Sequence, residues 1–192
     1  FSFFPTKNLG AAGDGGAVTT SNAELAQAMR ELAVHGMPER YLHTSLGYNS
    51  RLDAMQAAVL NVKLPKLEEW ISKRTAIAER YRDALGDLKG LSLPTTENGH
   101  SWNQFVVRIG SCPTGQPLCN ASCNPSTTSA RHGILESCCR DWVKQTLQER
   151  GVSTIIYYPI PIHRQPAYAH LGLKQGSLPE TEQLCSQVLS LP

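Results

Sequence analysis

The chain reads Phe3-Phe4-Pro5-Thr6-Lys7-Asn8-Leu9-Gly10 near its start, followed by Gly13-Asp14-Gly15-Gly16. Lys7 therefore lies between an apolar, aromatic stretch and a glycine-dense turn. Burial of an ammonium group is costly, so a buried Lys7 would be pushed toward its neutral form. A neutral lysine amine condenses with carbonyl groups to give Schiff bases. A single lysine is more often exposed beside a turn, so the role of Lys7 depends on the rest of the sequence.

Two further segments of the chain are equally distinctive. One is Gly47-Tyr48-Asn49-Ser50-Arg51-Leu52-Asp53, which continues to Gln56-Ala57-Ala58. The other is Tyr157-Tyr158-Pro159-Ile160-Pro161-Ile162-His163, which continues to Gln165-Pro166-Ala167-Tyr168. In this order, the three segments resemble the DegT/DnrJ/EryC1/StrS aminotransferases, which are pyridoxal-phosphate enzymes that mostly build amino sugars on nucleotide carriers. The resemblance covers almost the whole chain, apart from residues 110–138.

The resemblance implies an α/β fold, the C-terminal part of a fold type I pyridoxal-phosphate transferase similar to aspartate aminotransferase. Residues 1–64 would complete the large cofactor-binding domain. Residues 65–192 would form a small C-terminal domain with a Cys-rich insertion near residues 110–138. Because the lysine of such enzymes lies near the middle of a longer chain, we expect these residues to be a fragment, the C-terminal half.

Three residues are expected to serve the cofactor, pyridoxal 5'-phosphate, which needs an amine for its aldehyde and donors for its phosphate. Lys7 is the catalytic residue and supplies the amine. Ser2 matches a serine that contacts the phosphate in the family, although a serine at a strand edge can also bond to backbone or water. Asn49 offers two side-chain donors, and the matching family residue reaches the phosphate of the partner subunit's cofactor. An Asn that bonds within its own loop is the alternative.

His163 and Tyr158 are the expected substrate-binding residues. Pro159 and Pro161 stiffen the loop and limit where the imidazole of His163 points. In the family this loop lines the nucleotide-sugar side of a cleft. A surface histidine is the alternative for His163, and a core position is the alternative for Tyr158.

The function implied by the resemblance is transfer of an amino group, from glutamate, to a nucleotide-linked keto sugar in amino-sugar, polysaccharide or antibiotic biosynthesis. Related enzymes that remove a sugar hydroxyl carry histidine where Lys7 stands, so Lys7 favours an aminotransferase. The partners implied are the nucleotide sugar, the amino donor and a second copy in a homodimer with shared active sites. Two alternatives stay open: a non-enzymatic regulatory or partner-binding member, and an inactive truncated product.

The composition is that of an ordinary globular protein. The 192 residues carry a net charge of +2, with Lys and Arg dispersed among acidic residues, so charge does not argue for a nucleic-acid partner. No apolar run approaches the ~20 residues that span a bilayer, and no secretion signal opens the sequence. We therefore expect a cytoplasmic protein without a membrane partner.

The six cysteines lie at positions 112, 119, 123, 138, 139 and 185. Zinc sites usually show two separated pairs of ligands. Here Cys119 and Cys123 are four apart and Cys138 and Cys139 are adjacent, with His132 as a possible further ligand. The expected state is free thiols in a reducing compartment, and no metal site is predicted.

The spacing of apolar residues and the positions of Gly and Pro predict alternating helices and strands. Ser21 or Asn22 should cap a helix that ends near Gly36. Leu52, Met55, Val59 and Val62 repeat at helical spacing before Pro65. The expected helices are 23–34, 52–64, 66–85, 136–150 and 180–189, and the expected strands are 17–20, 91–93, 102–109 and 152–158.

Overall fold

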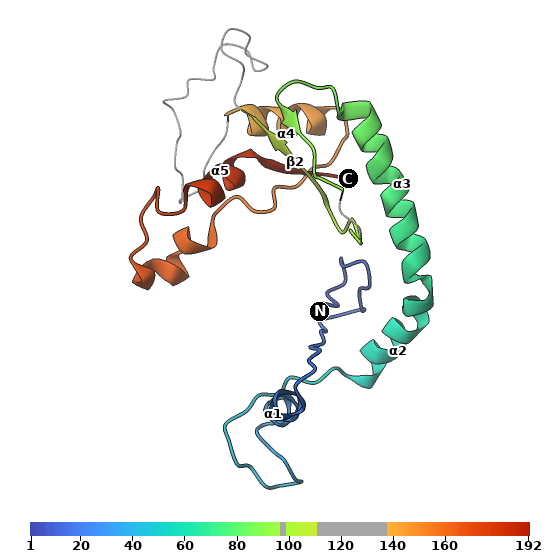
Figure 1. The fold of residues 1–192 in the computed structure, drawn as a ribbon, viewed down its shortest axis with the longest axis vertical. Helices are drawn as coiled ribbons and strands as arrows, with labels where there is room; N and C mark the ends of the chain where they lie inside the picture. Colours follow the sequence, from blue (N-terminus) through green and yellow to red (C-terminus); the bar gives the residue numbers. More distant parts are fainter. Residues whose placement is uncertain (97–98, 111–137) are drawn as a thin grey trace. The chain divides into compact units, whose positions relative to one another are not determined.

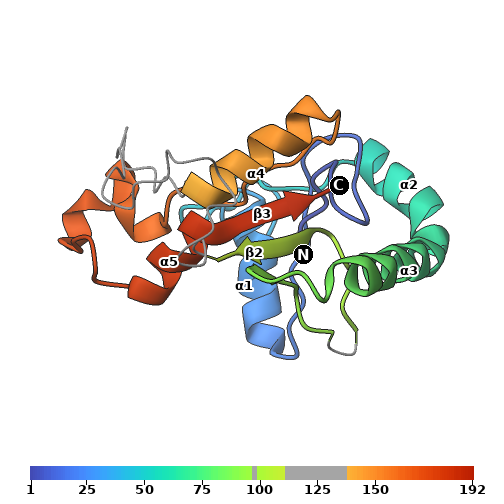
Figure 2. The same cartoon turned by 90° about the horizontal axis from the view of Figure 1, so that it is seen from above.

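The computed structural model describes residues 1–96, 99–110 and 138–192, so most of the predicted Cys-rich insertion lies outside the described residues. Figures 1 and 2 show a mixture of helices and strands, as an α/β fold requires. The chain divides into two compact units, Phe1–Lys73 and Arg74–Pro192. The predicted domain boundary at residues 64 and 65 stays a prediction.

Helix α1 (Ala23–Ala33) begins and ends where the sequence predicts. The Oδ1 atom of Asn22 accepts the N–H of Leu25 at 2.9 Å, which satisfies one of the donors left free at a helix start. Gly36 has φ +68° and donates its N–H to the carbonyl of Glu31 at 2.8 Å, which closes the C-terminal turn.

Helix α2 (Ala54–Lys63) is capped by Asp53, whose Oδ1 accepts the N–H of Gln56 at 2.8 Å. A short 3₁₀ turn, η1 (Leu64–Lys66), separates it from α3 (Leu67–Leu85). Pro65 lies in this turn, so the prediction that it ends the preceding helix is confirmed.

The periodic apolar residues of α2 do not form its packed face. Met55 and Val62 are each 77% exposed and Leu52 is 39% exposed, whereas Leu60 is the buried residue of the helix. Periodicity reports spacing along a helix, and it does not select a face when several faces carry apolar residues.

The predicted strand at residues 17–20 is wrong for the described part of the chain, where these residues belong to no strand and are exposed. Ala17 exchanges backbone hydrogen bonds with Phe1, and Ser2 forms an isolated antiparallel bridge with Gly16. A strand exists only where a second backbone supplies a ladder of partners.

The second unit is built on a three-stranded antiparallel sheet in the order β1-β2-β3. The strands are β1 (Leu91–Ser92), β2 (Phe105–Ile109) and β3 (Val188–Leu191). Alternate residues of β2 are buried, and Val107 pairs with Leu189. The buried core consists of Ala78, Trp102, Phe105, Val107, Ile109, Cys139 and Leu189.

Helix α4 (Cys138–Glu149) runs beside β3 in both ribbon views (Figures 1 and 2). Val143 and Leu147 of this helix pack against the core, whereas Trp142 is 39% exposed and Arg140 is 1% exposed. The Arg140 guanidinium donates to the carbonyls of Cys185 and Val188 and to Asp141. These bonds join α4 to the start of β3 and satisfy the donors of a buried cation.

The C-terminal region corrects two predictions. Helix α5 (Pro179–Gln187) ends earlier than predicted, and residues 188–191 form β3 instead of the last turn of a helix. The predicted strand at 152–158 is reduced to one bridge between Ile155 and Ser190. Residues 159–178 contain the 3₁₀ turns η2 (Ile162–Arg164) and η3 (Pro166–Leu171).

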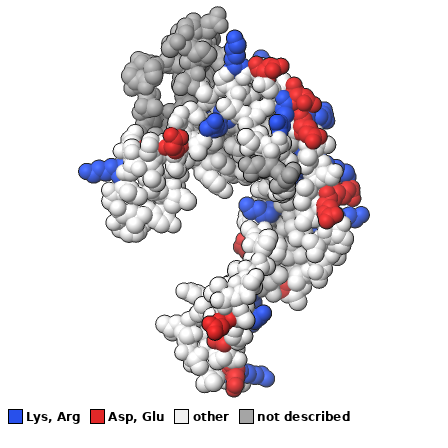
Figure 3. Space-filling view, in the orientation of Figure 1, with Lys and Arg blue, Asp and Glu red and all other residues white. Residues whose placement is uncertain are grey.

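Acidic and basic side chains are interspersed along α3, and Figure 3 shows both signs of charge on one face of the molecule. Lys73 and Glu69, one helical turn apart, form an exposed ion pair at 2.6 Å. Among the described residues, no helix has the length and apolar composition needed to cross a membrane.

Leu189 is expected to be a key stabilising residue of the second unit, because it is 0% exposed and belongs to the buried core. Leu189→Ala should lower the free energy of unfolding by about 3 kcal/mol, through lost burial and the cavity left behind. Leu173→Ala, at a position 43% exposed, is the control and should change it by less than about 1 kcal/mol. Urea denaturation measures both, and equal effects would contradict the assigned core.

Candidate active site

Lys7 lies on a loop that the backbone closes on itself. The N–H of Phe3 donates to the carbonyl of Gly15 at 2.8 Å, and the N–H of Ala11 donates to the carbonyl of Phe3 at 2.7 Å. Within this loop, the N–H of Lys7 donates to the carbonyl of Phe4 at 2.9 Å. Lys7 is half-buried in this arrangement. The loop therefore holds the lysine backbone in a defined place and leaves its side chain partly accessible.

Gly10 explains why the loop can be this tight. It is buried, and a Cβ atom there would approach the carbonyl oxygen of Phe4 to 2.9 Å and collide with the backbone of Pro5. Only a residue without a side chain lets the returning chain pass this close. The sequence signal for this contact is the glycine that follows three residues after Lys7.

Ser2 lies at the base of the same loop, where its backbone bridges to Gly16. Its Oγ atom accepts the N–H of Phe4 at 3.4 Å, and the residue is exposed. A hydroxyl that accepts one bond keeps its own O–H proton for donation to another group. Ser2 and Lys7 therefore belong to one local structure, as the sequence interpretation requires.

Asn49 lies elsewhere in the first unit. Its backbone bridges to Val34, and its Oδ1 atom accepts the Nε–H of Arg51 at 3.1 Å. The side-chain oxygen of Asn49 is thereby engaged while the amide nitrogen keeps its donor capacity. Arg51 thus braces Asn49 directly, through a contact that its place two residues later makes possible.

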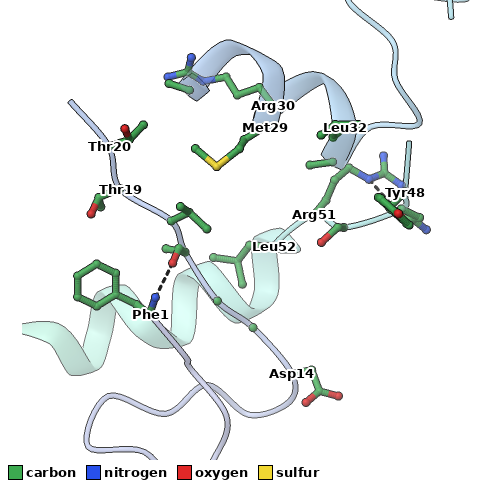
Figure 4. Close-up of a pocket in the computed structure, with 18 residues that line it drawn as sticks. Phe1, Asp14, Thr19, Thr20, Met29, Arg30, Leu32, Tyr48, Arg51 and Leu52 are labelled. Atoms are coloured by element: carbon green, nitrogen blue, oxygen red, sulfur yellow. Dashed lines mark hydrogen bonds between the residues drawn. The ribbon is translucent and has the colours of Figure 1, made fainter. Parts of the chain in front are cut away.

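Asn49 lines an open cavity of about 1030 Å³ between residues 14–20, α1 and residues 48–52 (Figure 4). Met29 extends into it from α1, and Leu52 extends into it from the segment before α2. Its charged and polar lining residues are Asp14, Thr19, Thr20, Arg30, Asn49, Ser50 and Arg51. Lys7 and Ser2 are not part of this lining, so the cavity does not join the three predicted cofactor residues.

His163 is a buried residue of the second unit, with 7% of its surface exposed, so the alternative of a surface histidine is wrong. Its Nε2 atom lies 3.1 Å from Oε1 of Glu182 at the start of α5. The carboxylate of Glu182 also accepts the N–H of Gly176 at 2.9 Å. This cluster ties η2 and the preceding proline-rich segment to α5.

Tyr158 is 66% exposed, so the alternative of a core position is wrong. Its ring meets that of Tyr157 edge to face, with 5.4 Å between the ring centroids. Tyr158 and His163 belong to the second unit, whereas Ser2, Lys7 and Asn49 belong to the first. The predicted site residues thus fall into one group in each unit.

Three residues that hydrogen-bond to His163 or to the loop of Lys7 were not predicted from the sequence: Gln56, Lys63 and Glu182. Gln56 and Lys63 reach the loop of Lys7 from α2, and Glu182 anchors His163. A hydrogen bond between residues far apart in the chain leaves no local sequence pattern. Of the three, Gln56 alone lies in one of the distinctive segments noted in the sequence.

No group of three or more His, Cys, Asp or Glu that could hold a metal occurs among the described residues. Cys185 is a free thiol, and Cys139 is buried. Burial raises the pKa of Cys185 above its usual value, while the nearby Arg140 opposes the shift. Cys112, Cys119, Cys123 and His132 lie outside the described residues.

Comparison with known proteins gives a family match over residues 1–192, to the DegT/DnrJ/EryC1/StrS aminotransferase family. The erythromycin biosynthesis sensory transduction protein EryC1 of Saccharopolyspora erythraea is 41% identical over 194 residues. That match covers 100% of this chain and 45% of EryC1. A dTDP-3-amino-3,4,6-trideoxy-alpha-D-glucose transaminase of Streptomyces venezuelae is 40% identical over 194 residues, covering 100% of this chain and 44% of the relative.

Among solved structures, S. venezuelae DesV in complex with a ketimine intermediate matches with a TM-score of 0.81 and 40% identity. The match covers 100% of this chain and 45% of DesV. The chain therefore spans less than half the length of these relatives.

The contacts of Glu182 predict a pH dependence of stability. The N–H of Gly176 holds the pKa of Glu182 below its usual value, helped by His163 and opposed by burial. The ionised carboxylate therefore stabilises the fold above the ordinary carboxyl pKa, and this contribution is lost as pH falls through the lowered pKa. Urea midpoints measured from about pH 7 to about pH 3 should fall less steeply in Glu182→Gln than in the parent. Glu180→Gln, which changes an exposed acid on the same helix, is the control; parallel curves for parent and Glu182→Gln would contradict the assignment.

Proposed function

Because the chain belongs to the DegT/DnrJ/EryC1/StrS aminotransferase family, we propose that its full-length protein transfers an amino group from glutamate to a nucleotide-linked keto sugar. The predicted family and α/β fold class are confirmed. That these residues are the C-terminal half of the enzyme stays a prediction. The observation that supports the proposed function most directly is the placement of Lys7. Lys7 is half-buried on a loop that is closed by backbone hydrogen bonds and by the close approach of the chain at Gly10.

Aminotransferases of this family depend on pyridoxal phosphate, and the residues of the first unit fit that group. When bound, pyridoxal phosphate supplies an aldehyde carbon for amines and a ring that accepts electrons. Lys7 would hold the aldehyde carbon through its Nζ atom. Ser2, at the base of the same loop, has an O–H proton for a charge-assisted bond to the phosphate.

Lys7 has a second task in this proposal. Once the amino donor takes its place, the amine of Lys7 is free to accept a proton from the donor's α-carbon. Lys7 would then donate a proton from its Nζ atom to the cofactor, and would move protons in the reverse direction when the keto sugar is aminated. The closed loop supports this role because general base catalysis requires an amine held within hydrogen-bond reach of the reacting carbon. A histidine, found in the related dehydrating enzymes, cannot act as the amine anchor.

Asn49 is proposed to serve the cofactor phosphate of a second copy in a homodimer with shared active sites. The cavity that Asn49 lines does not include Lys7, which supports a role outside the site of its own chain. The bond from Arg51 orients the Asn49 amide, so that its nitrogen can donate to an anion.

Tyr158 and His163 are proposed to bind the nucleotide sugar. The exposed ring of Tyr158 offers a surface for a sugar or a base. The contact of His163 with Glu182 fixes both the imidazole, which is proposed to meet the substrate, and the proline-containing loop that carries Tyr158. The proposed compartment is the cytoplasm, where a free thiol such as Cys185 stays reduced.

A second candidate function is regulation without catalysis. The relative EryC1 is named a sensory transduction protein, which is the observation that favours it. The presence of Lys7, Ser2 and Asn49 favours the enzymatic function, because a protein that binds partners without catalysis does not require an ordered lysine amine. The two functions differ in whether Lys7 is needed for activity.

Lys7→Ala in the full-length protein should abolish the visible absorption of the lysine-bound cofactor and lower amino transfer by about 10³-fold, since the amine serves as both anchor and base. Absorption spectra and a glutamate-dependent assay measure the two effects. The control is Lys89→Ala, an exposed lysine of the second unit. If Lys7→Ala kept the absorption of the parent, the enzymatic assignment would be wrong.

Sharing of active sites has its own test, based on mixing two inactive variants. Lys7→Ala removes the amine of one chain, and Asn49→Asp places a negative charge where a phosphate is proposed to bind. Refolding the two together should restore about a quarter of the parent activity, because half of the dimers are mixed and each then has one intact site. No recovery after verified mixing would show that Lys7 and Asn49 serve the same chain's site.

A further inference from the structure

We propose that Gln56 and Lys63 of α2 are positioning residues for Lys7, because their side chains hold the segment that closes the lysine loop. The inference rests on the proposed function of Lys7. Both residues lie far along the chain from the loop, and both direct a polar group at its backbone. Neither touches the reacting atoms in this proposal, and each acts through residues 10–12.

Gln56 holds the loop through its amide group. Its Oε1 atom accepts the N–H of Ala12 at 2.8 Å, across 44 residues of sequence. The amide lies so close to Gly13 that a Cβ atom there would come within 3.2 Å of Nε2. Gln56 is half-buried, and Asp53 fixes its backbone by capping α2. The amide of Gln56 is therefore held between the first turn of α2 and residues 12 and 13 of the loop.

Lys63 holds the loop through a charge-assisted hydrogen bond. Its Nζ atom donates to the carbonyl of Gly10 across 53 residues of sequence. The bond is partly buried, where a hydrogen bond from an ammonium group is stronger than at the surface. Gly10 is also the residue whose missing side chain lets the loop close against Pro5.

Both side chains come from one face of α2. Gln56, Leu60 and Lys63 are spaced by four and then three positions, which places them in line on a helix. Leu60 is 7% exposed, and Ala11, which lies between the two loop residues that are held, is 4% exposed. A buried apolar residue therefore lies between the two bonded residues on the helix and on the loop alike.

The residues that α2 holds are close to Lys7 in the chain and belong to the same hydrogen-bonded loop. Lys7 precedes Gly10 by three residues, and the N–H of Ala11 completes the bond to Phe3 that closes the loop. A shift of residues 10–12 must therefore move the lysine backbone. Because an error of about 1 Å in a catalytic group can cost ~10²-fold in rate, positioning from α2 should affect the reactivity of Lys7 even though α2 is not in the site.

The test compares side chains of equal size that keep or lose the bonding group, in the full-length protein. Gln56→Met and Lys63→Met preserve length but remove the acceptor and the donor, whereas Gln56→Glu and Lys63→Arg keep them. The first measurement, on the apoprotein, is the rate at which pyridoxal phosphate and borohydride modify Lys7, followed by peptide mass spectrometry. The second is the pH at which the visible absorption of the loaded protein changes.

We expect both Met variants to slow Lys7 modification by about tenfold or more and to shift the pH of the absorption change. Gln56→Glu and Lys63→Arg should remain within about threefold of the parent. The matched control is Asn61→Ala, an exposed polar residue on the same helix. If Gln56 and Lys63 contributed to stability alone, the Met variants would have a lower unfolding midpoint. Their rate of Lys7 modification and the pH of their absorption change would then equal those of Gln56→Glu and Lys63→Arg.

The outcomes separate this inference from the proposed function. If Lys7 is required for the absorption but the Met variants behave like Asn61→Ala, the positioning role is wrong and the function stands. If Lys7 is not required, the proposed function fails first. Should a Met variant not fold, Gln56→Asn provides the same comparison, because its amide is one methylene shorter and withdraws the acceptor from Ala12. Parent-like modification of Lys7 in Gln56→Asn would overturn the inference.

Discussion

Closure of the lysine loop is the constraint on which the candidate site depends. Phe3 pairs with Ala11 and Gly15 through its two backbone groups, so residues 3–15 return on themselves within a few ångströms. Fixing the backbone of a loop costs about 1–2 kcal/mol per residue in conformational entropy. That cost is offset by backbone bonds inside the loop and by the contacts made with α2. A nucleophilic amine benefits from this arrangement, because its backbone is already ordered before any ligand arrives.

Helix α2 shows how a small element can support a site without a large core. Its buried residue, Leu60, lies between Gln56 and Lys63 in the sequence, and these two flanking residues bond to the loop. The two hydrogen bonds fix residues 10–12 of the loop against the helix. In the second unit the corresponding task falls to Glu182, which binds His163 and Gly176 together. In both units a long-range polar contact orients the segment that carries the predicted site residues.

The helices of this protein could be predicted well and its strands poorly. Asn22 and Asp53 are capping residues written in the sequence next to the helices they start, and Pro65 ends α2 where its missing N–H requires. Such signals act over a few residues. The strand at 188–191 exists because Leu189 finds Val107, which lies some eighty residues earlier, and local propensity read the same residues as helix. The residues at 17–20 show the reverse case, with strand-forming side chains and no ladder partner among the described residues.

By itself the sequence determined which side chains are available for chemistry: a lysine between aromatic residues and glycines, a serine five positions earlier, and the family to which these segments belong. These are local facts, carried by residue identity and order. Only the tertiary structure decided that Gln56 and Lys63 hold the lysine loop, that His163 is buried against Glu182, and that Tyr158 is exposed. The physical reason is that each of these depends on a hydrogen bond or a burial between segments distant in the chain, and such contacts follow from folding and leave no mark on local sequence.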